Sequence, residues 1–531
     1  MRDANTRFLW ALLCAGIWLV TTAAMAGDDD DDSSADPLGG MESLDLRVSP
    51  KMKMRMPVPS ALMAEMDMGV TPGGAQDISV FRDQVASGSV PHPNTLTPEG
   101  LFSEHDLPID DVICRQTICV SGQTTTANIL VQPEVKYLAQ LGFSSNLNAA
   151  TWKRAPLNLV AVVDTSGSMG GEPLMTVRAS LMQVAAQLGK DDRLSIVRYA
   201  DGVQVVLQPT AGNHTAAIRK GIEQLYSSGS TYMEEGLKKG FEVAQQSAKS
   251  FAGSTRVMLF TDERPNVGAT DAGSFMGMAR ANSRKGIGMT TIGVGVHFGA
   301  ELATKISSVR GGNLFFFPSV DEMKKVFTEE LDTMVTEMAY NMKLVVAPTR
   351  GMKIAGVYGV PGELLIWGKN GEIELEVETL FLSTKKGAIY VAFESDSRLG
   401  LPRNSATPGN DIGRVQVTYT GTDQKKYQSQ VVFRLAKPSA ISSGLSRGLL
   451  LVNQITSIRK AASLHHEKND QAAAYRVIKN LASLFRYNTD EELSNEKELV
   501  FALENTLAKM SGHHGEPAHN HTNPVTGLPA N

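Results

Sequence analysis

Apolar residues fill both faces of a short segment near position 160, a pattern typical of a buried strand. Six of the seven residues from Leu157 to Val163 are apolar. A strand covered by helices on both sides has no polar face, so its sequence is apolar at odd and even positions alike. The run is followed by a glycine-rich turn that contains Asp164, Ser166 and Ser168. A buried strand that ends in three oxygen-bearing side chains needs an explanation.

Strands of this kind alternate with amphipathic segments between residues 155 and 340. In the first amphipathic segment, apolar residues recur every three or four positions and predict one buried helix face: Leu174, Val177, Leu181, Val184 and Leu188. The apolar strands are predicted at 157–164, 193–200, 203–208, 255–262, 288–296 and 312–317. This alternation predicts an α/β domain with a doubly wound, mostly parallel, Rossmann-like sheet.

Strands without intervening helices flank this region. They dominate residues 341–437, and similar β-branched runs occur within residues 76–150. Short strands punctuated by turns are typical of a β-sandwich. We therefore expect 76–150 and 341–437 to form one sandwich, with the α/β domain inserted into it. The pattern becomes helical again over residues 444–510, which predicts two or three amphipathic helices.

The two ends of the chain differ in composition from the rest. Arg2 and Arg7 precede an apolar run and a small-residue A-M-A site, so residues 1–26 are predicted to be a cleaved signal peptide of an exported, periplasmic or cell-surface protein. The alternative is an uncleaved N-terminal anchor, which would be the chain's membrane contact. Residues 27–75 are predicted to be a disordered tether, and residues 511–531 a disordered tail that contains histidines.

Overall charge argues against one class of partner. The 531 residues carry a net charge of −5, with 42% hydrophobic and 20% charged residues. A protein that binds nucleic acid usually presents a large basic field, which this composition does not provide. Nucleic acid is therefore not an expected partner.

Two cysteines remain after removal of the signal peptide. Cys114 and Cys119 lie in the segment CRQTIC, flanked by β-branched residues. In an oxidising compartment such a pair can close a small disulfide, and the alternative is a pair of reduced thiols in a strand. The methionine-rich stretch 52–68 could bind Cu(I) or could simply be a flexible segment.

The oxygen-bearing residues after the first buried strand have counterparts elsewhere. Thr231 lies before a predicted helix, and Asp262 ends the strand 255–262. In an open parallel sheet, ligands bind beyond the carboxyl ends of the strands. Five hard oxygen donors without thiolate or imidazole favour a divalent metal, first Mg²⁺ and then Mn²⁺ or Ca²⁺, over zinc. Each residue alone could instead cap a helix or turn.

The run D-T-S-G-S at 164–168, with Thr231 and Asp262, resembles the metal-ion-dependent adhesion site (MIDAS) of von Willebrand factor type A (VWA) domains. The resemblance covers about residues 76–360, and the chain is similar there to bacterial exported VWA proteins that carry a β-rich region around the domain. It weakens after residue 360.

The resemblance implies a role for each residue of the site. Ser166 and Ser168 would bind the metal directly, Thr231 would join them in the ligand-bound state, and Asp164 and Asp262 would act mainly through water. A shell of hydroxyls and water leaves the cation under-neutralised, so it can accept a carboxylate from a protein partner as its last ligand. The resemblance therefore implies a non-enzymatic adhesion or binding protein.

One stretch departs from the family pattern. Relatives commonly have glycine after the last aspartate, whereas this chain has Glu263 and Arg264. Glu263 could add a donor to the metal, and Arg264 could pair with the partner's carboxylate. Alternatively, both side chains are simply solvated.

Other functions remain as alternatives. The protein could be an envelope scaffold or assembly factor in which the metal is mainly structural. The segment GLSRG at 444–448 matches the serine hydrolase pattern G-x-S-x-G, but no strand precedes it, so a helix N-terminus is expected. The tail residues His513, His514, His519 and His521 could chelate a transition metal, or could serve only as part of a polar tail.

Overall fold

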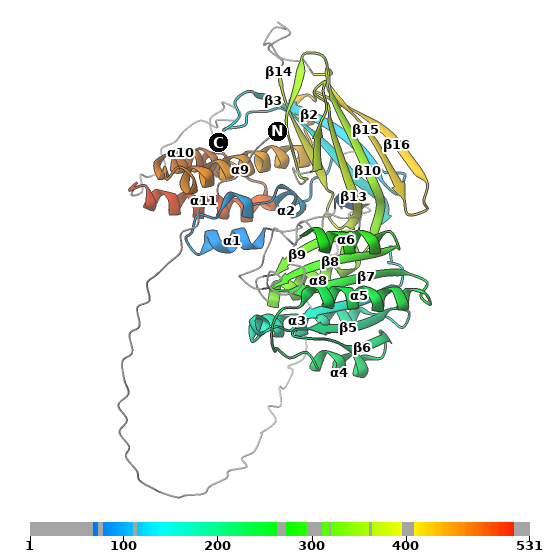
Figure 1. Ribbon diagram of the computed structural model, residues 1–531. Coiled ribbons are helices and arrows are strands. Elements are labelled where there is room, and N and C mark those ends of the chain that lie inside the picture. Colours follow the sequence, from blue (N-terminus) through cyan, green and yellow to red (C-terminus); the bar gives the residue numbers. More distant parts are fainter. Residues whose placement is uncertain are drawn as a thin grey trace, which may run out of the picture. The chain divides into compact units, whose positions relative to one another are not determined.

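Figure 1 shows a computed structural model of the chain. The structure describes residues 67–72, 78–109, 114–262, 272–294, 311–317, 320–360, 364–395 and 408–513. The predicted signal peptide, most of the predicted tether and the tail from residue 514 onward lie outside the described residues. Within these ranges, no helix has the length and apolar character needed to cross a membrane.

A six-stranded sheet forms the centre of the α/β region. Its strands lie in the order β6-β5-β4-β7-β8-β9. All neighbours are parallel except β5 and β6, which are antiparallel. The strands are β4 (Leu157–Asp164), β5 (Arg193–Tyr199), β6 (Val203–Ala211), β7 (Ser254–Thr261), β8 (Ile287–Val294) and β9 (Gly312–Phe317). The predicted doubly wound, mostly parallel sheet is confirmed, with one antiparallel edge.

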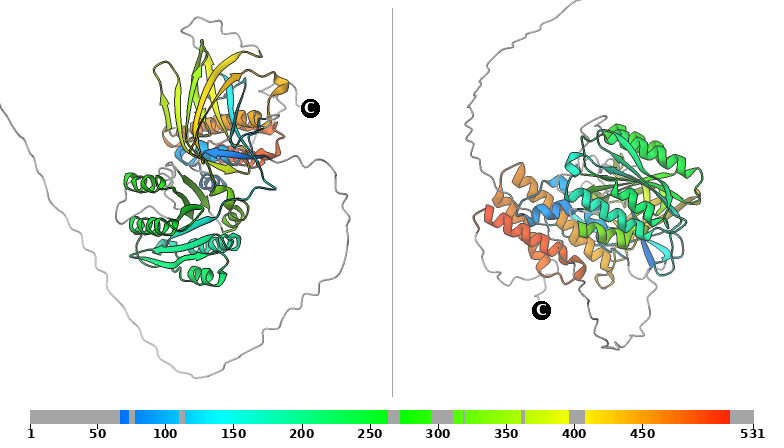
Figure 2. Two further views of the ribbon diagram at one scale, coloured as in Figure 1. Left: turned by 90° about the vertical axis from the view of Figure 1, so that its right-hand side faces the viewer. Right: turned by 90° about the horizontal axis from the view of Figure 1, so that it is seen from below.

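Helices cover both faces of this sheet (Figures 1 and 2). Along β4, Leu159 and Ala161 face one core with α3, α4 and α8, whereas Val160 and Val162 face a second core with α5 and α6. The helices are α3 (Glu172–Gln187), α4 (Thr215–Glu223), α5 (Met233–Ala248), α6 (Ala272–Ser283) and α8 (Val320–Met334). Because successive side chains of a strand point to opposite faces, β4 must be apolar throughout.

The strands before and after the α/β region form one antiparallel sheet of ten strands. The main path is β11-β14-β3-β1-β13-β10-β15-β16, with β2 paired to β3 and β12 to β13. The strands are β1 (Asp67–Pro72), β2 (Cys119–Thr126), β3 (Val135–Asn148), β10 (Glu337–Pro348), β11 (Met352–Tyr358), β12 (Leu365–Trp367), β13 (Ile373–Ser383), β14 (Ala388–Ser395), β15 (Asp411–Gly421) and β16 (Lys426–Arg434). The α/β unit is therefore inserted between β3 and β10.

This antiparallel sheet curls around its own apolar core. Strands β14 and β16 lie far apart in the strand order, yet the rings of Phe393 and Phe433 contact each other with centroids 6.1 Å apart. An isolated bridge between Thr124 and Leu435 joins β2 to the chain just after β16. One hydrogen-bonded sheet thus encloses the core on opposite sides, as two sheets of a sandwich would.

Part of the predicted tether is a strand. The tether was expected to run to residue 75, but β1 pairs with β13 and β3. Val70 is fully buried in the sheet core and Met68 is nearly so. Two apolar residues at alternating positions are enough to place a short segment between two longer strands, because the neighbouring strands supply the backbone partners.

The predicted C-terminal helices are α9 (Ser443–His466), α10 (Gln471–Arg486) and α11 (Ser494–Met510). They pack against two further helices, α1 (Ser79–Ala86) and α2 (Pro98–Ser103), around a shared core. The range 76–150, predicted to be the N-terminal part of the β-sandwich region, therefore also contains two helices that pack with the C-terminal helices. Four short 3-10 helices complete the described elements: η1 (Pro93–Thr95), η2 (Gly167–Met169), η5 (Pro438–Ala440) and η6 (Glu491–Leu493).

Sequence spacing explains why the segment near residue 80 is helical. Ile78, Phe81 and Val85 recur every three or four residues, and all three are buried against the C-terminal helices. This is the spacing of one helix face, whereas a strand would require alternation. Thr97 caps α2 by accepting a hydrogen bond from the Gly100 amide.

Candidate functional site

Asp164 lies at the carboxyl end of β4 and is fully buried. Its Oδ1 accepts a hydrogen bond from the Ser166 amide at 2.9 Å. Its Oδ2 accepts bonds from the Tyr199 hydroxyl at 3.1 Å and the Thr261 hydroxyl at 2.9 Å. Burial raises the pKa of the Asp164 carboxyl, and these neutral donors only partly oppose that rise. A cation beside the carboxylate would compensate for its burial.

Ser166 and Ser168 connect this carboxylate to the end of β7. Their hydroxyl oxygens lie 3.1 Å apart, and the Ser168 hydroxyl donates to Asp262 Oδ1 at 3.1 Å. Ser166 and Asp262 are buried, whereas Ser168, within η2, is exposed. The oxygens therefore run from the buried edge of the sheet to the surface.

The loop that carries Thr231 is bonded to the loop after β4. The Gly167 amide donates to the Gly229 carbonyl at 3.0 Å, and the Ser228 amide donates to the Thr165 carbonyl at 2.7 Å. Thr231 itself is buried just before α5. All five residues that the sequence singled out are thus carried by three adjoining loops at one edge of the sheet.

The donor chemistry of these residues fits a hard divalent cation. Asp164, Ser166, Ser168, Thr231 and Asp262 all offer oxygen, and Mg²⁺, Mn²⁺ and Ca²⁺ prefer oxygen ligands. In the described part of the chain, the hydrogen-bond partners of Asp164 are neutral groups and include no basic side chain. A bound cation would therefore balance the negative charge of the Asp164 carboxylate.

Three supporting residues escaped the sequence analysis. Tyr199 and Thr261 end the two strands beside β4, and both hold the Asp164 carboxylate. Asp201 follows β5, and its Oδ1 accepts a bond from the Ser230 amide at 2.7 Å in the Thr231 loop. All three lie at or just after the end of a strand. This position could have identified them from the sequence, because neighbouring parallel strands end at the same edge of the sheet.

Other sequence-predicted residues lie elsewhere or outside the described ranges. Glu263 and Arg264 fall outside the described residues. The sulfur atoms of Cys114 and Cys119 lie 2.08 Å apart, with Cα atoms 5.5 Å apart, at the start of β2. This geometry suits the predicted disulfide.

The G-x-S-x-G segment is the first turn of α9, as expected. The Ser442 side chain caps the helix by accepting a bond from the Leu445 amide. Gly448 is needed for packing, because an added Cβ would lie 2.0 Å from Cε1 of Tyr390. Helix packing therefore explains these glycines without a nucleophile elbow, which requires a strand before the serine.

A buried charged cluster lies between α1, the end of α2 and α11. Arg82 pairs with both Glu104 and Glu496, and His105 Nε2 lies 3.2 Å from Glu496. Within the described ranges, Glu104, His105 and Glu496 have three ligand atoms close enough to hold a metal ion. Arg82 already pairs with both carboxylates, so the cluster is better explained as an ion-pair network that ties these helices together.

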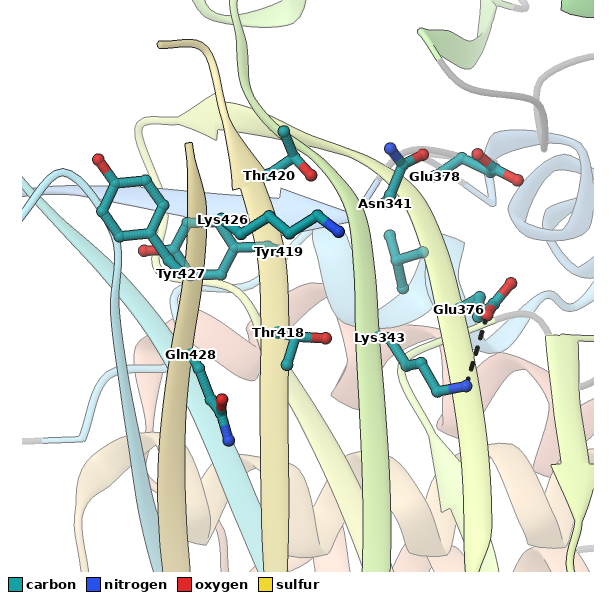
Figure 3. Close-up of a pocket in the computed structure, with 11 residues that line it drawn as sticks. Asn341, Lys343, Glu376, Glu378, Thr418, Tyr419, Thr420, Lys426, Tyr427 and Gln428 are labelled. Carbon is teal, nitrogen blue, oxygen red and sulfur yellow. Dashed lines mark ion pairs between the residues drawn. The ribbon is translucent and has the colours of Figure 1, made fainter. Parts of the chain in front are cut away.

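A polar hollow of about 570 Å³ lies on the antiparallel sheet (Figure 3). Lys343 on β10 and Glu376 on β13 form an ion pair across it at 3.8 Å. Its other lining residues come from the same two strands and from β15 and β16. None of the residues that the sequence singled out lines this hollow.

Comparisons with known proteins agree with the α/β architecture. A model of the von Willebrand factor type A domain matches residues 158–329. The uncharacterized protein YfbK of Escherichia coli is 33% identical over 190 residues, covering 35% of this chain and 32% of that protein. The uncharacterized protein sll0103 of Synechocystis sp. is 27% identical over 271 residues, covering 50% of this chain and 62% of that protein.

A solved structure described as von Willebrand factor type A from Catenulispora acidiphila is 14% identical, with a TM-score of 0.47. The match covers 81% of this chain and 94% of the chain in the solved structure. The chain thus spans 32% of the length of the first relative and 62% of the second. Residues 158–329 are therefore a von Willebrand factor type A domain, which belongs to a domain family of protein interaction and adhesion.

Proposed function

We propose that this protein is an exported, non-enzymatic binding protein that engages a partner protein through a MIDAS. The site holds a divalent cation, Mg²⁺ by preference, with Asp164, Ser166, Ser168, Thr231 and Asp262. The observation that carries the proposal is the chain of contacts from Asp164 through Ser166 and Ser168 to Asp262 at the carboxyl edge of the sheet.

Burial divides these residues into two groups. Asp164 is fixed by three donors and has its oxygens occupied, so it acts on the cation through water or through the serine hydroxyls. Ser168 is exposed and points its hydroxyl toward Asp262, so it supplies the face of the site that a partner can reach. When bound, the metal supplies an electrophilic position that can accept an oxygen ligand from outside.

The charge of the donor set favours an acidic partner. Two of the five donors are carboxylates, and the other three are neutral hydroxyls. A cation held mainly by hydroxyls and water keeps much of its positive charge, so it attracts a carboxylate more strongly than an amide. We therefore propose an aspartate or glutamate of the partner as the external ligand.

Glu263 and Arg264 are proposed to modulate this contact. If Glu263 occupies the external position, Glu263→Gly restores the usual family sequence and increases metal-dependent capture of the partner. If Glu263 instead helps to bind the metal or partner, the same change reduces capture. Arg264 is proposed to pair with the partner's acid, so Arg264→Ala reduces capture without changing Mg²⁺ affinity.

A second candidate is an envelope scaffold whose metal is mainly structural. The observation that favours it is the extent of the chain outside the α/β unit: a ten-stranded sheet and a helical bundle, each with its own core. In this alternative, the sheet or the helices make the partner contacts, and the metal only holds the three loops together.

Two measurements test the proposal. Calorimetry of Asp164→Asn should show a loss of Mg²⁺ and Mn²⁺ binding, because the amide removes the charge while keeping the size of the side chain. Unchanged affinity would overturn the metal assignment. Capture of partners from envelope extract should then be compared with and without EDTA. Partners lost with the metal support the adhesion site, and partners retained support the scaffold.

A further inference from the structure

Four neighbouring strands of the antiparallel sheet form the polar hollow on their outer face. Strands β13, β10, β15 and β16 lie side by side in that order. Successive side chains of a strand point to opposite faces, so every second residue of each strand faces the hollow. The residues between them face inward, and Met342, Val377 and Tyr419 belong to the core of the sheet.

The strand register arranges the outward-facing side chains in two rows. In the first row, Lys343 lies opposite Glu376 on one side and Thr418 on the other, and Thr418 lies opposite Gln428. The charges of this row are already compensated, because Lys343 forms ion pairs with both Glu374 and Glu376.

The second row ends in two charges that are not compensated. The register places Asn341 opposite Glu378 and Thr420 opposite Lys426, and Tyr340, just before Asn341, pairs with Thr420. In the described part of the chain, the Glu378 carboxylate and the Lys426 ammonium make neither an ion pair nor a hydrogen bond. The row therefore has an available negative group at one end and an available positive group at the other.

The distance between these two charges suits a small molecule. Figure 3 shows the Lys426 side chain extending over β15 toward Asn341, with Glu378 beyond Asn341 on β13. Neighbouring strands lie about 4.8 Å apart, so the backbones of β13 and β16 are about 14 Å apart. The two charged side chains shorten this distance. An extended peptide of two or three residues, at about 3.3–3.6 Å per residue, spans what remains.

Asn341, in the middle of the second row, has an unusual backbone conformation. Its φ is 49°, and the register between β10 and β15 shifts at this point. Such a bulge re-aims a side chain, and residues with positive φ cluster at binding sites. The Asn341 amide has no hydrogen-bond partner in the described ranges. Because an amide offers both a donor and an acceptor, it can bind the backbone of a peptide.

We propose that this hollow binds a short peptide with free termini. The peptide ammonium pairs with Glu378, the peptide carboxylate pairs with Lys426, and Asn341 and Thr420 hydrogen-bond to the peptide bonds between them. The volume of about 570 Å³ lies within the usual range of small-ligand sites. Two lysines and two glutamates line the hollow, so it has no net charge that would favour an anion or a polycation. The site is independent of the proposed metal site.

Tri-alanine is the probe, titrated into the full chain and followed by saturation-transfer NMR. EDTA is present throughout, so that the peptide carboxylate cannot bind a metal at the α/β domain. Tri-alanine should bind saturably. N-acetyl-tri-alanine lacks the positive end and tri-alanine amide lacks the negative end. Each should bind about threefold more weakly or worse, because each loses one solvent-exposed ion pair.

Variants assign each end of the peptide to one side chain. Glu378→Gln should no longer distinguish tri-alanine from its N-acetyl form, and Lys426→Met should no longer distinguish it from its amide. Glycine adopts a positive φ without strain, so Asn341→Gly should stay folded and still bind tri-alanine more weakly. The control is Lys425→Met. Lys425 is exposed, pairs with Asp423 and does not line the hollow, so its loss should change nothing.

Three results would overturn the proposal. Absence of saturable tri-alanine binding would remove the peptide site. Unchanged discrimination between the free and capped peptides in both Glu378→Gln and Lys426→Met would place the peptide elsewhere on the chain. Saturable binding of maltotriose without binding of tri-alanine would assign the hollow to a neutral saccharide. Mg²⁺ affinity is measured separately by calorimetry, so each of these results leaves the proposed function standing.

Discussion

The Ser168 hydroxyl donates a hydrogen bond to Asp262 Oδ1 at 3.1 Å, across a separation of 94 residues. Ser168 lies in the loop after β4, and Asp262 follows β7. Strands β4 and β7 are parallel neighbours, so their carboxyl ends meet at one edge. This contact joins two of the three loops on which the proposed function rests.

Removal of the Ser168 hydroxyl should weaken metal binding and leave folding intact. Ser168→Ala removes the hydrogen bond to the buried Asp262 carboxylate, so it should lower the free energy of unfolding by about 1–3 kcal/mol. Mg²⁺ affinity measured by calorimetry should fall by about tenfold or more if the hydroxyl is a ligand. Ser254→Ala, an exposed serine at the amino end of β7, is the matched control. Equal affinity in the two variants would contradict the ligand role.

Gly229→Ala should displace the loop that carries Thr231. The residue has a φ of 70°, and an added Cβ would lie 1.9 Å from Asp201 Oδ2. The left-handed conformation alone costs a non-glycine residue about 1–2 kcal/mol. Denaturant unfolding should show at least this loss, and metal-dependent partner capture should fall as well.

Two further variants separate the effect of the steric clash from the effect of the backbone strain. Gly229→Ala with Asp201→Ala removes the clash but keeps the strain, so it should recover part of the lost stability. Gly277→Ala is the control, since no atom lies within 4 Å of its added Cβ in α6. It should stabilise the protein by about 0.5–1 kcal/mol, as alanine does in a helix interior. Equal losses in Gly229→Ala and Gly277→Ala would contradict this account.

The buried Glu496 should make the helical bundle sensitive to acid. Burial by itself would raise the pKa of the Glu496 carboxyl, but the hydrogen bond from His105 and the charge of Arg82 outweigh it and lower the pKa to about 2. The ordinary value is 4.5, so the folded state favours the ionised form. Its stabilising contribution is therefore present above about pH 4.5 and is lost as the pH falls toward 2.

Glu496→Gln tests this pH dependence. At neutral pH, the change breaks a buried ion pair and should lower the free energy of unfolding by about 3–5 kcal/mol. The difference from wild type should shrink as the pH falls from 4.5 toward 2. Glu498→Gln alters an exposed residue of the same helix and should show neither effect. A difference that stays constant with pH would contradict the assignment to Glu496.

Cys114 and Cys119 should be oxidised in protein isolated from cells, if the chain is exported. Disulfides persist in oxidising compartments and are rare in the cytosol. Intact mass spectrometry without reductant should find the protein about 2 mass units lighter than the dithiol form, because disulfide formation removes two hydrogens. Thiols that alkylate readily without reductant would count against the disulfide and, more weakly, against export.

Local sequence determined the α/β sheet and the composition of its proposed site. The apolar run of β4 and the helical spacing in α3 are short-range patterns, and they follow directly from the 2.0 and 3.6 residue periods of strands and helices. Asp164, Ser166, Ser168, Thr231 and Asp262 could be selected because parallel strands place their carboxyl ends together, so strand order was enough to group them.

Only the tertiary structure decided the contacts that depend on distant partners. The periodicity of residues 79–86 is present in the sequence, but its helix is stabilised by apolar partners in α9, α10 and α11, far along the chain. Tyr199 and Thr261 look like ordinary strand residues until their hydroxyls meet Asp164. His92 lies more than 370 residues before His466, and no local sequence pattern predicts that their rings are in contact. Such pairings arise because packing of whole elements, rather than local propensity, fixes which side chains meet.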